Sequence, residues 1–185
     1  GVGLRNSLEL NQKNSVIQMG VAASCDTLND SVGGVNDDKN GLDLLIGLTQ
    51  VVDKNTLVTA NYTHGITEGF ISDPYKVVEL NGELIAENRP DSKDKDVIYL
   101  VLDRFVEVLR GALEVSGRYY ADSFGIEANT VEMAWYQKVG EFWIVRPMFR
   151  YYDQNAADFY AVRFTGAPEY YSSDYRVSAF RAFGY

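Results

Sequence analysis

FWIVRPMFRYY, residues 142–152, alternates between two kinds of side chain. One face carries Trp143, Val145, Pro147, Phe149 and Tyr151, and the opposite face carries Arg146, Met148 and Arg150. A period of two residues is typical of a β-strand with one apolar and one polar face. This stretch therefore predicts a strand at the surface of an apolar layer.

The same alternation recurs along the whole chain. It predicts nine strands, at roughly 3–10, 15–25, 42–52, 56–64, 96–106, 111–120, 128–137, 142–152 and 174–185. Most of them are close to the ~9–11 residues that a tilted strand needs to cross a bilayer. Strands of soluble sheets average only about five or six residues. The strand lengths therefore favour a membrane sheet.

The predicted connections alternate in length. Tight turns fall at Asn11–Asn14, Asp53–Asn55, Glu107–Arg110 and Lys138–Glu141. The connections between them are Asp26–Gly41, Gly65–Lys95, Ala121–Glu127 and Asp153–Ser173, three of them long. Short turns on one rim and long loops on the other are typical of outer-membrane barrels, whose long loops face the outside of the cell.

These patterns predict an all-β fold for residues 1–185, an antiparallel up-and-down transmembrane β-barrel. Aromatic residues near the predicted strand ends, such as Tyr62, Tyr119, Trp135 and Trp143, resemble the girdles at a membrane surface. We expect the outer membrane of a Gram-negative bacterium, with its lipid around the chain. Alternation alone leaves a soluble antiparallel sandwich or barrel open as the alternative.

Composition argues against several other classes of protein. The formal net charge is −9, whereas nucleic-acid binding needs clustered Lys and Arg. Cys25 is the only cysteine and His64 the only histidine, so a disulfide framework and a Cys- or His-pair zinc site are both excluded. No run of 18 apolar residues predicts a transmembrane helix. We expect no metal site, no cofactor, no nucleic-acid partner and no catalysis.

Five longer motifs carry a resemblance to a known family. They are GFISDPYK at 69–76, RPD at 89–91, RYYADSFGI at 118–126, RPMFRYYDQNAADFY at 146–160 and SSDYR at 172–176. On these motifs the chain resembles the middle to C-terminal region of a bacterial family of outer-membrane barrels that is named only as a domain of unknown function.

The resemblance implies location and fold but no activity, so it assigns no functional residue. Members of that family are longer at both ends, which implies that further strands belong to the barrel. The strand count points the same way, because nine is odd and single-chain bacterial barrels have an even number of strands. We therefore expect a fragment of a larger, even-stranded barrel.

A row of charged residues is the first candidate site. Same-face residues pair across antiparallel strands, which places Glu132 opposite or diagonal to Arg146, and Arg118 opposite Thr130. The expected ladder inside the barrel consists of Glu114, Arg118, Glu132, Arg146 and Arg150. Two interpretations remain open: the charges pair and hold a plugged or solvated lumen, or the arginines select anions or dock a partner.

The second candidate site is an aromatic patch in the loop 153–173. Its members are Phe159, Tyr160, Phe164, Tyr170 and Tyr171. So many aromatics in an exposed segment favour packing against the barrel rim or interior, or docking of a protein.

Together these features predict a noncatalytic outer-membrane barrel. It would act as a porin-like channel of unknown permeant, or as the membrane component of an envelope complex with other envelope proteins as partners. The alternative is a soluble extracellular β-sheet module that binds through its aromatic loops.

Overall fold

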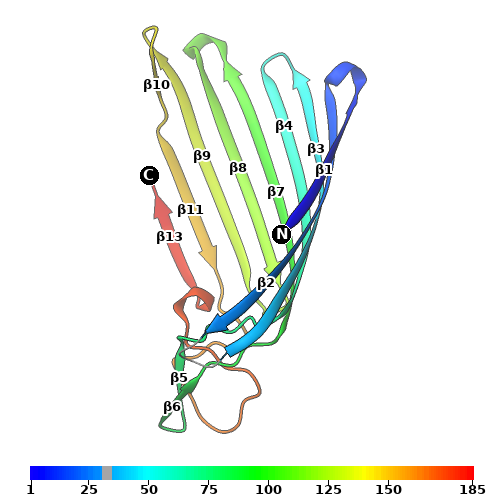
Figure 1. Cartoon of the computed structure of the whole chain (residues 1–185). Helices are drawn as coiled ribbons and strands as arrows, with labels where there is room; N and C mark the ends of the chain where they lie inside the picture. The colour runs from blue at the N-terminus through cyan, green and yellow to red at the C-terminus, as the bar shows by residue number, and fades with distance from the viewer. Residues whose placement is uncertain (31–34) are drawn as a thin grey trace.

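The computed structural model describes residues 1–30 and 35–185. These residues form one ten-stranded antiparallel sheet in which each long strand lies beside its predecessor in the chain (Figure 1). The strands are β1 (Val2–Leu10), β2 (Ser15–Asp30), β3 (Val35–Asp53), β4 (Thr56–Gly69), β7 (Ser92–Val106), β8 (Gly111–Asp122), β9 (Glu127–Val139), β10 (Trp143–Val145), β11 (Met148–Gln154) and β13 (Phe180–Gly184). The predicted all-β, antiparallel, up-and-down arrangement is confirmed.

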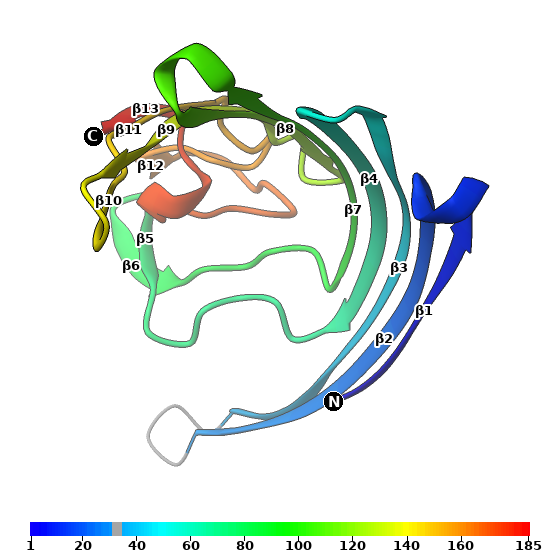
Figure 2. The same cartoon turned by 90° about the horizontal axis from the view of Figure 1, so that it is seen from above.

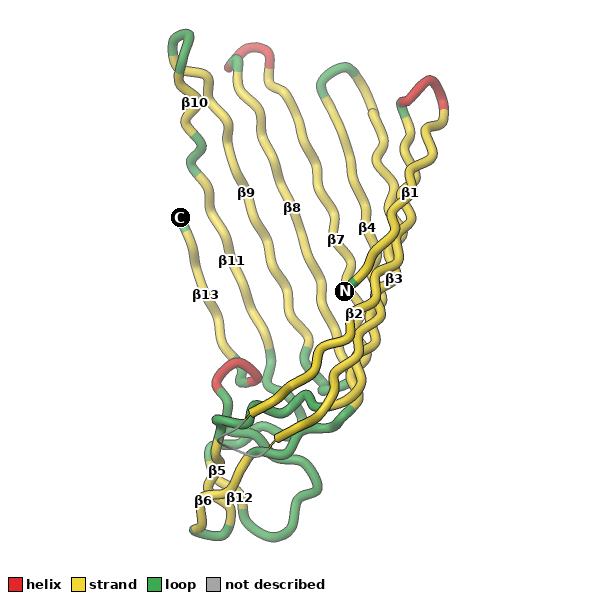
Figure 3. The backbone as a smooth tube through the Cα atoms, viewed as in Figure 1, coloured by secondary structure: helices red, strands yellow, loops and turns green. Residues whose placement is uncertain are grey.

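A second, three-stranded sheet lies at one end of the large sheet (Figures 1 and 3). It consists of β5 (Val77–Leu80), β6 (Glu83–Ala86) and β12 (Arg163–Phe164), with β12 parallel to β5. These strands come from the two longest predicted loops. We call residues 70–91 and 155–179 together the cap.

The tight turns gather at the end of the sheet that lies opposite the cap (Figure 3). Two of them contain short 3-10 helices, η1 (Asn11–Lys13) and η2 (Glu107–Leu109), and a third, η3 (Tyr175–Val177), belongs to the cap. The turn after η2 closes through Arg110, whose φ of 50° is left-handed. No helix in the described part of the chain is long and apolar enough to cross a membrane.

Several predicted boundaries were wrong. The strand predicted at 56–64 extends to Gly69, and the strand predicted at 96–106 begins at Ser92. Residues 26–41 are mostly not a loop, because β2 and β3 stay paired from Cys25 opposite Asn40 to Asp30 opposite Val35. Backbone hydrogen bonds hold this ladder although its side chains are polar, and residues 31–34 lie outside the described part. The strand predicted at 174–185 begins only at Phe180, because Asp174 caps η3.

The strand predicted at 142–152 is divided into β10 and β11 at Arg146 and Pro147. Proline has no N–H to donate to a ladder, which explains the break. Its carbonyl still accepts a hydrogen bond from the N–H of Trp135, at 3.1 Å.

The large sheet is strongly curved and has two different faces (Figure 2). Its convex face exposes a continuous set of large apolar side chains, including Leu4, Leu8, Met19, Val21, Leu42, Leu44, Ile46, Leu48, Tyr62, Ile98, Leu100, Leu102, Tyr119, Val131, Met133, Phe149 and Phe183. The concave face carries most of the polar residues that alternate with them, together with apolar exceptions such as Leu45, Val97 and Val101. The predicted division into an apolar and a polar face is therefore confirmed.

The packed core lies between the cap and the loop that joins β8 to β9, and not within the large sheet. It consists of Phe124, Ile126, Ala157 and Val177, with partly buried aromatics packed around it. Most large apolar side chains of the sheet are exposed instead.

The sheet is open in this structure. β1 and β13 are its two edges, and within residues 1–30 and 35–185 they are not paired with each other. The nine-strand path between these edges matches the nine predicted strands in number and order.

Candidate functional site

The predicted charge ladder lies on the concave face of β8, β9 and β11. Its register agrees with the sequence analysis for Arg118, which lies opposite Thr130, and for Glu132, which lies opposite Ser116. On the other side of β9, Arg150 lies directly opposite Glu132. Arg146 precedes β11 and reaches Glu132 diagonally.

Arg146 joins the two acidic residues of the ladder. Its Nη2 lies 3.4 Å from Oε1 of Glu114 and 3.5 Å from Oε1 of Glu132. The guanidinium also lies 5.1 Å from the centre of the Tyr136 ring, which adds a cation–π contact. These side chains are partly exposed, so the cluster holds neighbouring strands together without a fully buried charge.

Arg118 and Arg150 differ from Arg146. Among the described residues, neither has a carboxylate within salt-bridge distance, and Arg118 only approaches the Tyr120 ring, at 5.9 Å. The structure therefore brings together Glu114, Glu132 and Arg146 as a paired cluster. It leaves Arg118 and Arg150 as exposed cations on the same face.

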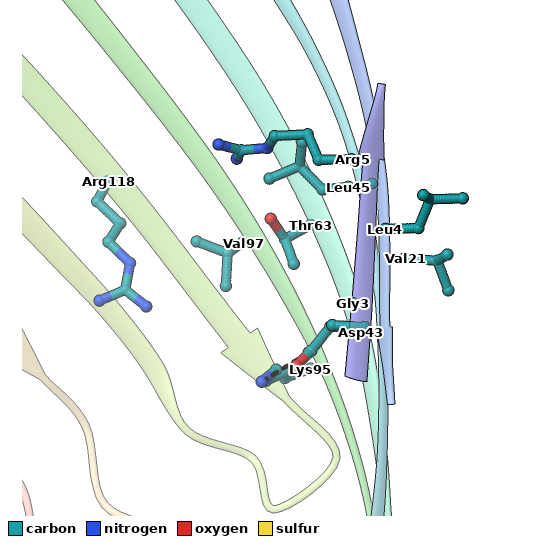
Figure 4. Close-up of a pocket in the computed structure, with 12 residues that line it drawn as sticks. Gly3, Leu4, Arg5, Val21, Asp43, Leu45, Thr63, Lys95, Val97 and Arg118 are labelled. Atoms are coloured by element: carbon teal, nitrogen blue, oxygen red, sulfur yellow. Dashed lines mark ion pairs between the residues drawn. The ribbon is translucent and has the colours of Figure 1, made fainter. Parts of the chain in front are cut away.

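A groove of about 450 Å³ runs along the concave face from β1 to β8. Figure 4 shows Arg5, Leu45, Thr63, Val97 and Arg118 on its inner side, while Leu4 and Val21 point the opposite way. One ion pair crosses it, from Nζ of Lys95 to Oδ1 of Asp43, at 2.9 Å.

A second pocket, of about 350 Å³, lies between the concave face and the cap. Strands β8, β9 and β11 contribute one wall, and Arg89, Arg176 and Val177 come from the cap side. Arg118 lines both this pocket and the groove. It therefore stands where the two cavities meet.

The cap is held together by a buried ion network. Arg89 Nη2 donates to Oδ2 of Asp174 at 2.8 Å and to Oε2 of Glu87 at 3.0 Å. Glu87 also accepts hydrogen bonds from the hydroxyl of Ser172 and from the backbone N–H of Asp73, each at 2.6 Å. Nε of Arg89 lies 2.9 Å from Glu87 but is not aligned for a hydrogen bond with any described residue.

Arg176 extends this network to the other cap segment. It contacts Asp73 and Asp174, and Asp174 is only 2% exposed. Burial alone would raise the pKa of the Asp174 carboxyl, but hydrogen bonds from Arg176 and Arg89 outweigh burial and hold that pKa well below its usual range. The hydrogen bonds of Arg176 to Asp174 and Asp73 raise the pKa of Arg176. Both ions thus stay charged at neutral pH.

The predicted aromatic patch lies within residues 155–179 of the cap and divides into two groups, one at the packed core and one away from it. Phe159 packs edge-to-face on Phe124, with ring centres 5.0 Å apart, and Tyr160 borders the same core. Phe164 and Tyr171 pack together farther out, at 5.9 Å, while Tyr170 is exposed. The patch is thus mainly part of the cap's packing.

A polar trio lies outside both candidate sites, on the convex face near the cap. Oδ1 of Asp96 accepts from the hydroxyl of Tyr62 at 2.6 Å and lies 2.9 Å from Nδ1 of His64. The residues opposite His64 are Leu44 and Asp96, so the neighbouring strands bring no serine beside it.

Sequence analysis missed the cap network. Its members Asp73, Arg89 and Asp174 all occur in the motifs that carried the family resemblance, at 69–76, 89–91 and 172–176. No periodic pattern connects these motifs, because their contacts join segments that lie far apart in the sequence. Their charges within otherwise polar loops were the one available signal.

The fold and these sites define a curved, open all-β sheet with a polar inner face and a loop cap. The chain belongs to the family described as Protein of unknown function (DUF3570), whose model matches residues 4–185. No curated protein and no solved structure matches the chain.

Proposed function

We propose that this chain is a noncatalytic outer-membrane β-barrel protein that acts as the membrane component of an envelope complex. In this proposal the edges of β1 and β13 pair with further strands to close the barrel. Outer-membrane lipid covers the convex face, and the cap lies outside the cell.

The apolar convex face carries this proposal. Soluble proteins rarely expose contiguous apolar patches larger than a few hundred Å². Here the large apolar side chains of nine neighbouring strands are exposed, and the packed core lies at the cap end of the sheet. Apolar-out and polar-in alternation is the pattern of transmembrane barrels.

The height of the apolar band also fits a membrane. On β7 the outward residues Ile98, Leu100 and Leu102 are flanked by Asp96 and Arg104. The eight residue steps from Asp96 to Arg104 cover about 26 Å along the strand. At a strand tilt of ~40° this corresponds to about 20 Å along the barrel axis. The apolar band of known barrels is about 25 Å tall.

The cap favours a role in a complex over free passage. It lies within the arc of the sheet in Figure 2 and is fixed by buried ion pairs. Its surface exposes apolar and aromatic side chains, with Tyr75, Val162 and Tyr175 each at least 70% exposed. Exposed aromatics are enriched where proteins dock.

Heating before gel electrophoresis tests the membrane proposal. We expect the protein to need detergent for extraction and to change its mobility after boiling, because folded barrels resist dodecyl sulfate at room temperature. A soluble, monomeric protein without detergent would refute the proposal and favour the extracellular binding module.

A channel for anions is the second candidate function. The observation that favours it is the pair of exposed cations Arg118 and Arg150, which lack carboxylate partners among the described residues. Rings of Arg and Lys favour anionic permeants. Conductance of the intact protein in a planar bilayer separates this function from a capped scaffold.

A further inference from the structure

The pocket between the cap and the concave face has an unusual lining. Four cationic side chains border it, those of Arg89, Lys93, Arg118 and Arg176. Among its described lining residues there is no carboxylate. The carboxylates that pair with these cations bind them from outside the pocket.

Three of the four cations are already paired. Arg89 and Arg176 contact Asp174, and Nζ of Lys93 lies 2.8 Å from Oδ2 of Asp122. These bonds fix the cations in place. Arg118 has no carboxylate within salt-bridge distance in the described part of the chain, so its charge is free to meet a ligand.

The charge balance around the pocket leaves one positive charge in excess. With Lys76, which lies 4.0 Å from Asp174, the five cations face four carboxylates, those of Asp73, Glu87, Asp122 and Asp174. Two cations on the cap side and two on the sheet side thus surround a space that one anion would neutralise.

The remaining walls are apolar, aromatic or neutral. Tyr120 and Tyr152 contribute rings, and Ile126, Ala128 and Val177 contribute aliphatic surface. The volume of about 350 Å³ is within the range of small-molecule sites. Gln154 does not supply a free donor, because its Nε2 binds the carbonyls of Arg176 and Ser178.

We propose that this pocket binds a small organic anion, with its carboxylate or phosphate at Arg118 and its apolar body against Tyr120, Tyr152 and Val177. Arginine binds both kinds of oxyanion through two parallel N–H donors. The ligand would lie between sheet and cap and so join them. This inference goes beyond the membrane role and does not depend on it.

Calorimetric titration of the folded protein with benzoate tests the site, in detergent or in water as the protein requires. We expect saturable binding to one site. Acetate lacks the apolar body and benzyl alcohol lacks the charge, so each should bind at least about tenfold more weakly. Binding of benzoate that is absent, or no tighter than that of benzyl alcohol, would overturn the proposal.

Variants locate the site. Arg118→Gln should weaken benzoate binding by about 10- to 100-fold, as expected for loss of a charge-assisted bidentate contact. Arg5→Gln and Arg150→Gln are matched controls, because both are arginines of the concave strands outside the pocket, and they should bind as the parent does. Equal weakening in all three variants would instead indicate a diffuse electrostatic effect and refute the site.

A conservative variant distinguishes a structural effect of Arg118→Gln from the loss of a ligand contact. Arg118→Lys keeps the charge but not the fork of donors, so it should recover part of the affinity. Circular dichroism should show equal β content in all variants. If Arg118→Lys bound no better than Arg118→Gln while both were folded, a role for the positive charge would be excluded.

Discussion

Pro147 interrupts a strand without shifting it. Val145 lies opposite Gln137 and Met148 lies opposite Ala134, and both pairs belong to the same antiparallel alignment. Arg146 therefore keeps the side of the sheet that alternation predicts, although it is outside both strands. Proline thus interrupts the backbone hydrogen bonds of the strand, but the alternation of side chains between the two faces of the sheet continues through it.

Asp174 supports a prediction about the cap. Asp174→Asn should open the cap at neutral pH, at a cost of about 3–5 kcal/mol, because the variant leaves Arg89 and Arg176 without their shared carboxylate. Hydrogen exchange at the amides of Asn88 and Tyr171, which bond each other across the cap, measures this opening. Glu83→Gln, on exposed β6, is the control and should exchange as the parent does.

The same residue sets the pH dependence of the parent cap. The pKa of Asp174 is lower in the folded state than in the unfolded chain, where it is about 3.9. Its stabilisation is therefore complete above about pH 5 and is lost as pH falls through the folded pKa. Cap opening in the parent, measured by exchange corrected for its intrinsic rate, should therefore increase progressively as pH falls below about 5, and Asp174→Asn should lack the part of this change that comes from the Asp174 carboxyl. Equal pH profiles of exchange in the parent and in Asp174→Asn would contradict the assignment of the pH dependence to Asp174.

At the scale of elements, alternation was sufficient to predict the nine strands and their tight turns. Each strand shows its faces in sequence, since every second residue is apolar, as in Leu42, Leu44 and Ile46. The strand ends near the cap were harder to predict from the sequence. β2 and β3 continue through polar residues such as Asp26 and Asp38, where backbone pairing provides the order and no hydrophobic pattern is visible.

The candidate site was only partly predictable, because the sequence indicates contacts between neighbouring strands but not contacts between distant segments. The ladder of Glu114, Glu132 and Arg146 follows from register between neighbouring strands, which sequence reveals. The network of Arg89 and Asp174 joins segments 85 residues apart. Nothing in local spacing indicates such a contact.

Strand β7 provides a test of which face meets lipid. Leu100→Arg places a charge in the middle of the convex band and should destabilise a bilayer-embedded sheet by about 2–4 kcal/mol. Val101→Arg, next to it on the concave face, should cost less because that side is polar. Urea unfolding from lipid vesicles measures both. A Leu100→Arg protein as stable as the parent would show that this face does not meet hydrocarbon.

At the scale of the molecule, we expect that residues 70–91 of the cap can be removed without opening the sheet. The N–H of Gly69 donates to the carbonyl of Asp91 at 2.8 Å, so residues 70–91 begin and end side by side. Replacing them with a short Gly-Ser linker should leave the strands paired and raise conductance in a planar bilayer. Conductance as low as that of the intact protein would mean that another element closes the passage.

The long reach of the cap contacts also has a consequence for the order of events during folding. Arg89 and Asp174 are 85 residues apart in sequence, and Asp73 and Arg176 are 103 apart, whereas the hairpins of the sheet join adjacent strands. Contacts between distant segments carry the larger entropic cost until the intervening chain is ordered. We therefore expect the cap to close late in folding, after the strands from β7 to β11 have paired with their neighbours.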